Sequence, residues 1–289
     1  MNGILVLDKP SGWTSHDVVA KCRNILSIKR IGHTGTLDPF ATGVLVLLVG
    51  KATRLAQFFG KAEKEYVAKL RFGFETTTGD RTGGPKSSLC DPLIKKDVLV
   101  DVLKSFVGEI EQIPPMFSAK KIGGKKLYEL ARKGIEIERK PIKVNIHKLE
   151  LMELSGCYAT VQLVCSAGTY VRSLAEDIGK KLEVGAHLVE LRRIRVGKFH
   201  VSQAYQIQDL ERAVKEGSVK LVNMNEALSD FIEKPLNSTE LSLVKQGNPI
   251  EEKQMKLKEG EFVRLSNGRE LVAIGVFQRM RIQPRVVLV

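Results

Sequence analysis

The sequence predicts an α+β protein with a mixed, mainly antiparallel central sheet flanked by helices, followed by a small β-rich C-terminal domain. Three observations support this fold class. Segments with strand-type alternation interleave with amphipathic helical segments along most of the 289 residues. Neighbouring strand candidates form hairpin-like pairs, which favours an antiparallel sheet over a doubly wound parallel one. After residue 230 the character of the chain changes to short strand candidates.

The N-terminal part of the chain alternates between the two kinds of element. A helix is indicated where Thr14 or Ser15 can cap an amphipathic segment, and strands where apolar residues alternate or run between glycines. The predicted elements are a strand over 3–9, a helix over 15–26, strands over 43–50 and 65–74, and a helix over 95–108 that ends at Gly108.

The rest of the chain predicts a second group of sheet elements and then a separate module. The predicted elements are an antiparallel pair over 141–154 and 158–168, a helix over 169–182 that runs to Lys181, and an irregular strand over 187–201. Residues 233–240 form a candidate linker, and 260–289 predict short strands around an Asn-Gly turn. We therefore expect one domain over 1–230 and a second over 231–289.

Positive charge is concentrated in one segment. The chain has 46 Lys and Arg against 33 Asp and Glu, a net charge of +13. Residues 117–148, which follow a Pro-Pro break, hold ten of the basic residues and three acidic ones, so this span carries +7. Clustered cations favour an anionic macromolecule such as RNA as partner, because phosphate contacts release counterions. A solvated lysine-rich surface is the alternative.

Several classes of protein find no support in the sequence. The four cysteines show no CxxC pair and the histidines are scattered, so neither a structural zinc site nor metal catalysis is indicated. GDRTGGPKSS resembles a phosphate-binding loop, but a proline precedes Lys86 and no apolar helix follows. No segment resembles a signal peptide or a membrane span. Free cysteines favour a reducing, cytoplasmic compartment.

The stretch GHTGTLDPFATG places one carboxylate, Asp38, in a glycine- and threonine-rich loop before a buried strand. Such a carboxylate, next to His33, is a candidate nucleophile or general base. Asp followed by Pro39 is also a common way to begin a turn, so the dipeptide alone does not decide between chemistry and structure.

The wider pattern of motifs is more specific. GHTGTLDPFATGVL, KEYVAKLRFG, TGDRTG, PPMFSAKKIGGKKLYELAR, CSAGTYVRSLAEDIG and LVELRRIRVG follow one another in this order. Together they resemble the TruB family of tRNA pseudouridine synthases over about residues 2–230. The tail is similar to the PUA-type RNA-binding module of that family. The resemblance implies a pseudouridine synthase fold with a PUA-like C-terminal domain.

The resemblance also implies an activity. The family isomerises one uridine in the T-loop of tRNA, position 55, by breaking the bond from ribose to N1 and forming one to C5. No group leaves, so no cofactor and no metal are expected. The segment 117–148 matches the insertion by which stand-alone members grip the T-stem-loop, so we expect tRNA as partner, no guide RNA and no membrane. A monomer is the family's usual state.

Roles for individual residues follow from the same resemblance. Asp38 corresponds to the nucleophile, Arg172 to the guanidinium that holds it, and Tyr66 to the aromatic residue that stacks on the target base. From the residues alone, Arg172 is equally well a surface helix residue and Tyr66 a core residue. Tyr170 and Leu191 match positions that line the uracil pocket, although an apolar residue before RRIR also fits simple packing.

The remaining candidates concern the RNA. His33 matches the residue that fills the stack after the target base flips out, and Asp80 is expected to brace the site. Lys120 and Lys121, with Lys125 and Lys126, are expected to contact backbone phosphates. Phe117 departs from the family pattern, in which tyrosine is frequent, so a hydroxyl hydrogen bond would be missing there.

Two other functions remain compatible with the sequence. One is a non-catalytic RNA-binding or RNA-folding protein that uses the basic segment and the C-terminal module. The other is an enzyme of the same family that depends on a guide RNA. The complete set of Asp38, Tyr66 and Arg172 favours an active enzyme over the first, and the basic insertion favours a stand-alone enzyme over the second.

Overall fold

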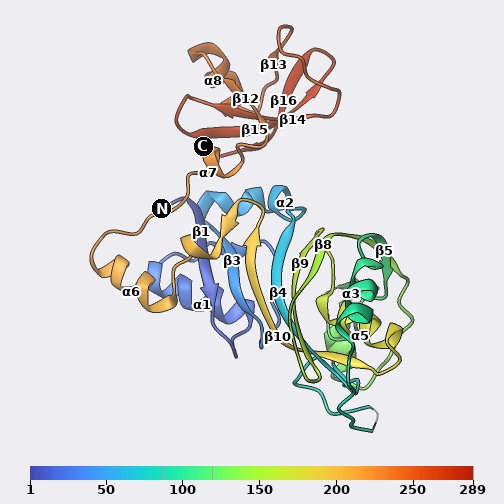
Figure 1. Ribbon diagram of the computed structural model, residues 1–289. Coiled ribbons are helices and arrows are strands. Elements are labelled where there is room, and N and C mark those ends of the chain that lie inside the picture. The colour runs from blue at the N-terminus through green and yellow to red at the C-terminus, as the bar shows by residue number, and fades with distance from the viewer. Residues whose placement is uncertain (87, 119, 289) are drawn as a thin grey trace.

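The computed structural model describes residues 1–86, 88–118 and 120–288. Figure 1 shows a large body built on one mixed sheet and a smaller sheet above it that contains the C-terminus. In the large sheet the strand order is β1-β3-β10-β4-β9-β8-β5, with β2 beside β3 and β11 beside β10. Only the contact between β10 and β3 is parallel among these pairs of described strands. The predicted mixed, mainly antiparallel sheet is therefore confirmed.

The N-terminal half of the large sheet is covered on both faces. Its elements are β1 (Gly3–Lys9), α1 (Ser15–Leu26), β2 (Ile31–His33), β3 (Thr42–Val49), η1 (Gly50–Leu55) and α2 (Ala56–Phe59). Thr14 caps α1 through a reciprocal pair of hydrogen bonds with Asp17. Alternate residues of β1 and β3 enter two different apolar clusters, one with α1 and one with η1 and α2. Residues 4–7 of β1 and 44–49 of β3 are consequently all apolar.

The other half of the large sheet packs its helices on one face. Its elements are β4 (Lys64–Phe72), α3 (Lys96–Lys104), β5 (Gly108–Gln112), β8 (Ile142–Ser155), β9 (Tyr158–Cys165), α5 (Val171–Lys181), β10 (Ala186–Val196) and β11 (Phe199–His200). Tyr66, Ala68, Leu70 and Phe72 alternate along β4 and join the cluster under α3 and α5. The residues between them face the opposite, more open side, which gives β4 its alternating sequence.

Gly43 allows the two halves of the sheet to meet. It lies at the start of β3, opposite Arg193 of β10, with φ +103°. A methyl group on Gly43 would lie 2.1 Å from the carbonyl oxygen of Arg193. Only glycine permits both this backbone conformation and this close approach of two strands.

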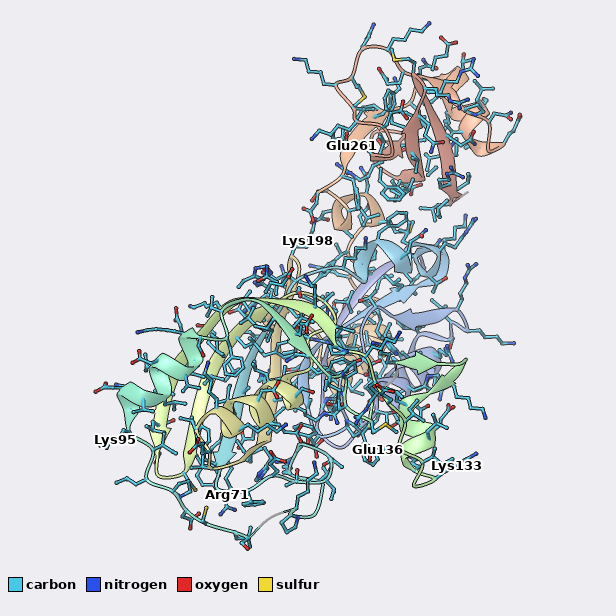
Figure 2. All side chains as sticks on the ribbon, turned by 90° about the vertical axis from the view of Figure 1, so that its right-hand side faces the viewer. Arg71, Lys95, Lys133, Glu136, Lys198 and Glu261 are labelled. Atoms are coloured by element: carbon cyan, nitrogen blue, oxygen red, sulfur yellow. The ribbon has the colours of Figure 1, made fainter. Side chains whose placement is uncertain are left out.

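A basic segment projects from the body between β5 and β8. It contains the short strands β6 (Lys121–Ile122) and β7 (Lys125–Lys126) and the helix α4 (Leu127–Ala131). Figure 2 shows Lys133 and Glu136 of this segment at one side of the body, far from Glu261, which directly precedes β14 (Phe262–Ser266) in the C-terminal part. Lys143 and Lys148, which the sequence groups with the basic residues, lie on β8 within the large sheet.

The C-terminal part forms the second sheet, in the order β12-β14-β15-β16-β13. It follows η2 (Val201–Gln203), α6 (Ile207–Lys215) and α7 (Met224–Ala227), and contains β12 (Ile232–Pro235), α8 (Ser238–Lys245), β13 (Ile250–Glu251), β14 (Phe262–Ser266), β15 (Leu271–Gln278) and β16 (Arg281–Val287). Phe58 of the body packs edge-on against Phe231 and Phe262. Leu271 and Ile274 enter the same apolar cluster as β1 and β3. The C-terminal sheet is thus packed onto the body.

Several predicted boundaries are wrong. The strand predicted over 187–201 is divided, because β10 ends at Val196 and a turn leads into the short strand β11. The helix predicted over 95–108 ends at Lys104, because the chain turns through Ser105–Val107 and Gly108 begins the edge strand β5. Residues 233–240, predicted as a linker, form most of β12 and the start of α8 instead. Asn237 caps α8 through a capping box with Glu240, a signal that the segment's polar composition obscured. Among the described residues, no helix is both long and apolar enough to cross a bilayer.

Candidate active site

Asp38 forms a two-point ion pair with Arg172. The aspartate lies in the loop between β2 and β3, where its carbonyl oxygen accepts a hydrogen bond from the amide of Ala41. Nε of Arg172 is 2.9 Å from Oδ2 of Asp38, and Nη2 donates to Oδ1 at 3.1 Å. This side-by-side geometry fixes the plane of the carboxylate as well as its position. The structure thus brings together two residues that are 134 positions apart in the chain.

Arg172 is itself held by backbone carbonyls. It lies in the first turn of α5 and is 5% exposed. Its Nη1 donates to the carbonyl of Thr78 at 3.1 Å, and Nη2 also donates to the carbonyl of Phe117 at 2.7 Å. The guanidinium therefore joins the Asp38 loop, the loop after β4 and the basic segment at one point.

Asp80 lies behind the pair as a second, buried carboxylate. Its Oδ2 is 3.8 Å from Nε of Arg172, while Oδ1 accepts hydrogen bonds from the Thr78 hydroxyl and from the amide and hydroxyl of Thr82. These donors satisfy one oxygen of the buried carboxylate. The other oxygen of Asp80 lies near Arg172, so Asp80 contacts the guanidinium that binds Asp38.

Burial and charge act in opposite directions on Asp38. Burial raises the pKa of this carboxyl above its ordinary value, and the Arg172 guanidinium lowers it. The carboxylate of Asp80 raises the pKa further, and the ammonium of Lys9 lowers it. The pKa of Asp38 is raised overall, and Arg172 is the principal group that opposes the effect of burial.

Lys9 fixes one side of the Asp38 loop through hydrogen bonds from its buried ammonium. It is the last residue of β1 and is 0% exposed. Its ammonium donates to the carbonyls of Pro10, Trp13 and Pro39 at 2.9, 2.6 and 3.1 Å. Burial lowers the pKa of Lys9 to about 8. A buried cation whose hydrogen bonds end on loop carbonyls holds Pro39, next to Asp38, in place.

Arg193 fastens the other side of the same loop. It is 1% exposed, and its guanidinium donates to the carbonyls of Val44, Thr36 and Gly35 at 2.7, 3.3 and 3.1 Å. Sequence reasoning missed both Lys9 and Arg193 as parts of the site. The signal available was a charged residue within or directly after an apolar strand, which requires an internal partner when the strand is central.

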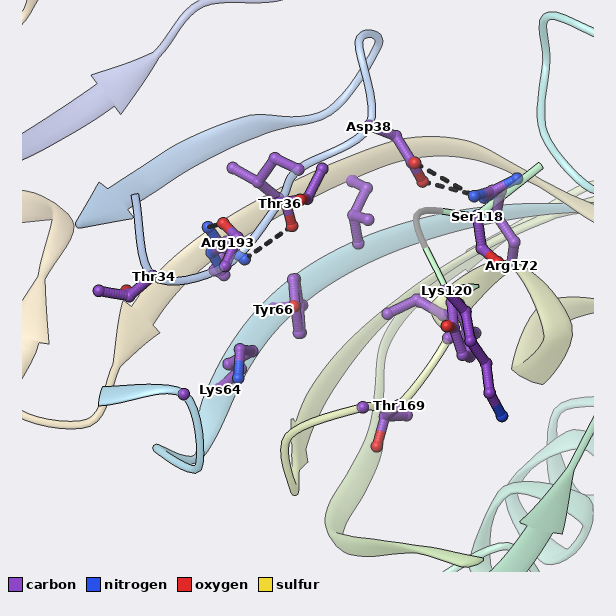
Figure 3. A pocket seen from close by; sticks show the side chains of 17 residues that line it. Thr34, Thr36, Asp38, Lys64, Tyr66, Ser118, Lys120, Thr169, Arg172 and Arg193 are labelled. Atoms are coloured by element: carbon purple, nitrogen blue, oxygen red, sulfur yellow. Dashed lines mark hydrogen bonds and ion pairs between the residues drawn. The ribbon is translucent and has the colours of Figure 1, made fainter. Parts of the chain in front are cut away.

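A cavity of about 280 Å³ opens beside the ion pair. Figure 3 shows Asp38 and Arg172 on one side of it and Tyr66 near its middle. Tyr66, Tyr170 and Leu191 line it together with Asp38 and Arg172. The walls therefore combine aromatic and aliphatic surface with one carboxylate–guanidinium pair, which suits a flat, partly polar ring. The structure brings these five predicted residues to one site.

Two of the lining residues are fixed by their surroundings. Tyr66 is almost fully buried on β4, and burial raises the pKa of its phenol. Tyr170 precedes α5, and the side chain of Gln112 binds its backbone on both sides, accepting from the amide at 3.0 Å and donating to the carbonyl at 3.2 Å. Gln112 is a further residue that the sequence gave no reason to select.

His33 and Asp80 lie on a neighbouring cavity of about 690 Å³. Asp38, Arg172 and Ser118 line both cavities, so the ion pair stands between them. Nδ1 of His33 is buried and has no hydrogen-bond partner in the part of the chain that the structure describes. Burial lowers the pKa of His33, so the imidazole is neutral at pH 7. A neutral ring at this place is suited to stacking.

The lysines of the basic segment divide into two cases. Lys120 lines the smaller cavity with Ser118. Lys121 lies on β6, and its side chain is outside the described residues, as is that of Lys126. Among the described residues, no cluster of three or more His, Cys, Asp or Glu side chains could hold a metal ion.

The sequence of the chain matches the models of one protein family. A model of the TruB family pseudouridylate synthase N-terminal domain matches residues 23–171, and a model of the tRNA pseudouridylate synthase B C-terminal domain matches 172–238. The chain belongs to the TruB family. This TruB-family chain is 49% identical over 216 residues to tRNA pseudouridine synthase B of Solibacter usitatus (strain Ellin6076), covering 75% of this chain and 74% of that protein.

Other relatives extend the similarity to nearly the whole chain. The tRNA pseudouridine synthase B of Pelotomaculum thermopropionicum (strain DSM 13744 / JCM 10971 / SI) is 41% identical over 286 residues, covering 95% of this chain and 90% of that protein. Among solved structures, a chain of a Cbf5-Nop10-Gar1 complex matches with a TM-score of 0.78 and 28% identity, over 99% of this TruB-family chain and 85% of the other. The predicted fold class and family are therefore confirmed.

Proposed function

We propose that this protein isomerises the uridine at position 55 in the T-loop of tRNA to pseudouridine, without a cofactor. Membership of the TruB family supports the reaction class, and the names of the relatives at 41–49% identity support tRNA as the substrate. The observation that carries the proposal is the Asp38–Arg172 pair at the wall of a cavity lined by Tyr66, Tyr170 and Leu191.

Asp38 acts as the nucleophile in this proposal. Covalent attack on the nucleoside requires an ionised carboxylate in a pocket from which the base excludes water. The two contacts from Arg172 supply a positive charge that favours the ionised form of Asp38, and they orient its oxygens. Asp38 forms a transient bond to the nucleoside, the bond between C1′ and N1 breaks, and the uracil turns. C5 then bonds to C1′, and the bond to Asp38 breaks to restore the carboxylate. The proton on C5 leaves and N1 gains one, so atoms and charge balance.

The two tyrosines and Leu191 hold the base during this rearrangement. Tyr66 stacks on the uracil ring, and Tyr170 and Leu191 complete the slot in which it rotates. Flipping the uridine out of the T-loop costs on the order of a few kcal/mol in lost stacking and pairing. His33, on the adjoining cavity, offsets part of that cost by stacking in the vacated place.

We also propose a division of labour between domains. Residues 1–230 form the catalytic domain, and 231–289 form a PUA-like RNA-binding domain. Within the catalytic domain, the basic insertion grips the T-stem-loop. Lys120, at the smaller cavity, and Lys121, on β6, contact phosphates there, and Asp80 braces Arg172.

We propose that the protein acts without a guide RNA or partner protein, and similar solved structures give a reason to test this part of the proposal. Two of the similar solved structures are a Cbf5-Nop10-Gar1 complex and an H/ACA RNP bound to a substrate RNA. Purified protein should be incubated with an unmodified tRNA transcript, with no other component, and pseudouridine mapped along the RNA. Pseudouridine confined to position 55 is expected. Product that forms only when a guide RNA or partner protein is added would overturn the proposal.

A further inference from the structure

We infer that Lys64 binds the phosphate group adjoining the target nucleotide, and so fixes the ribose relative to Asp38. This inference rests on the proposed function, because it names a contact between the same cavity and its RNA. Neither the ion pair nor the aromatic slot explains why a lysine belongs in this cavity.

The position of Lys64 is well defined. It begins β4, two residues before Tyr66, so both side chains leave the strand on the same face and both line the cavity. In Figure 3, Tyr66 lies between Asp38 and Lys64. A methyl group built on Gly35 would lie 3.7 Å from Cε of Lys64 and 3.8 Å from Nη1 of Arg193. The aliphatic stem of Lys64 thus passes close to the loop that carries Asp38.

The ammonium of Lys64 lacks an anionic partner among the described residues. Its hydrogen bond goes to the carbonyl of Ala62 at 2.9 Å, which leaves two of its three protons free for a ligand. The glutamates on either side, Glu63 and Glu65, both bind Arg195, at 2.7 and 2.8 Å. Burial and the nearby charge of Arg193 lower the pKa of Lys64. A ligand that brings negative charge would relieve this cost.

The surroundings of Lys64 fit a phosphodiester. Gly60 and Gly168 line the same cavity and are exposed, so part of its rim has no side chains and an RNA backbone can approach closely. When the base lies against Tyr66, the phosphates of the same nucleotide must leave the cavity across this rim. A lysine there meets an anion that is present in every RNA substrate.

A cycle of protein and RNA changes tests this contact. Wild type and Lys64→Gln are compared on a T-stem-loop RNA with normal phosphates and on RNAs with a neutral methylphosphonate on the 5′ or the 3′ side of the target uridine. We expect one of the two methylphosphonates to weaken wild-type binding and kcat/KM about 10-fold, the loss of one charge-assisted hydrogen bond. On RNA with normal phosphates, Lys64→Gln should show the same loss of binding and kcat/KM that the methylphosphonate causes in wild type. The same methylphosphonate should then have no further effect on Lys64→Gln. Lys64→Arg should keep most of the activity and the sensitivity.

Lys69→Gln is the matched control, since Lys69 lies on β4 but on the opposite face, 3.9 Å from Glu190. This variant should remain as sensitive to the methylphosphonate as wild type. The inference is wrong if each of the two methylphosphonates lowers affinity and rate as much in Lys64→Gln as in wild type. Reading the cycle in equilibrium binding separates the two proposals. RNA that binds with the expected coupling but yields no pseudouridine would overturn the proposed function and leave the Lys64 contact supported.

Discussion

The Asp38 loop and the basic segment use positive charge in opposite ways. Next to the loop, Lys9 and Arg193 are almost wholly buried and donate their hydrogen bonds to backbone carbonyls. In the basic segment, Lys125, Lys133 and most of their neighbours are exposed. The buried cations Lys9 and Arg193 fix the loop that carries Asp38. The exposed cations of the basic segment remain available to bind phosphates. The same residue types therefore serve precision in one region and affinity in the other.

Removal of Arg172 should have the largest effect that this comparison predicts. Arg172→Met is expected to lower the single-turnover rate by about 10²–10³-fold, the usual loss for one preorganised electrostatic contact. Without the guanidinium, burial is opposed less and the pKa of Asp38 rises further. Because the ionised form reacts, the acidic limb of the pH–rate profile should move to higher pH. Single-turnover kinetics over a pH series measures both effects, and an unshifted limb would contradict this role of Arg172.

Two glycine substitutions compare the rigidity of the two regions directly. Gly43→Ala places a methyl 2.1 Å from the carbonyl oxygen of Arg193 in a residue with φ +103° and should prevent stable folding or lower the melting temperature strongly. Gly124→Ala, in the turn between β6 and β7, also has a positive φ but no described atom within 4 Å. It should cost only about 1 kcal/mol of backbone strain. Thermal melts of the two variants measure the difference. Equal decreases in melting temperature would contradict the expectation that the two regions differ in packing.

Lys9 should link stability to pH. Burial lowers its pKa from 10.5 to about 8 in the folded protein. Between these values the unfolded chain binds a proton that the folded protein has lost, so wild-type stability should rise with pH from about 8 to 10.5. Denaturant unfolding of wild type and Lys9→Met across this range should show that stability changes more favourably with rising pH in wild type than in the variant. Equal slopes in the two proteins would mean that Lys9 does not titrate between those values on folding.

The smallest effect on chemistry is expected in the basic segment. Lys125→Gln removes an exposed charge from β7 and should weaken tRNA binding modestly, with a salt dependence shallower by roughly one phosphate contact. The rate at saturating tRNA should stay near that of wild type, because Lys125 is not among the residues that line the Asp38 cavity. Affinity measured over a salt series and the saturating rate together test the point. A lower saturating rate with unchanged affinity would assign Lys125 to the chemistry instead.

The sequence predicts the parts of the molecule that local pattern governs. Alternation along β4 and the cap at Thr14 identify their elements, and the order of motifs identifies Asp38, Tyr66 and Arg172 together. The helix predicted up to Gly108 fails because an apolar stretch continues beyond the last helical turn into β5. A continuous pattern does not show where the backbone changes direction.

The rest of the site depends on partners that lie far apart in the chain. Lys9 meets Pro39 across 30 positions, and Arg193 meets Gly35 across 158. Nothing in the local sequence of either residue shows that its side chain donates hydrogen bonds to backbone carbonyls of the Asp38 loop. Lys64 is similar, since it is available to bind RNA only because Arg195 forms ion pairs with both neighbouring glutamates. Such roles become visible only when the sheet brings the residues together.

The central claim is that Asp38 performs the chemistry while the remainder of the protein positions it. Asp38→Asn keeps the size of the side chain but removes the nucleophilic carboxylate. Single-turnover pseudouridine formation at position 55 should fall below detection, while the dissociation constant for tRNA stays within about threefold of wild type, a change of under 1 kcal/mol. Pseudouridine formation by Asp38→Asn at a rate close to that of wild type would contradict the account.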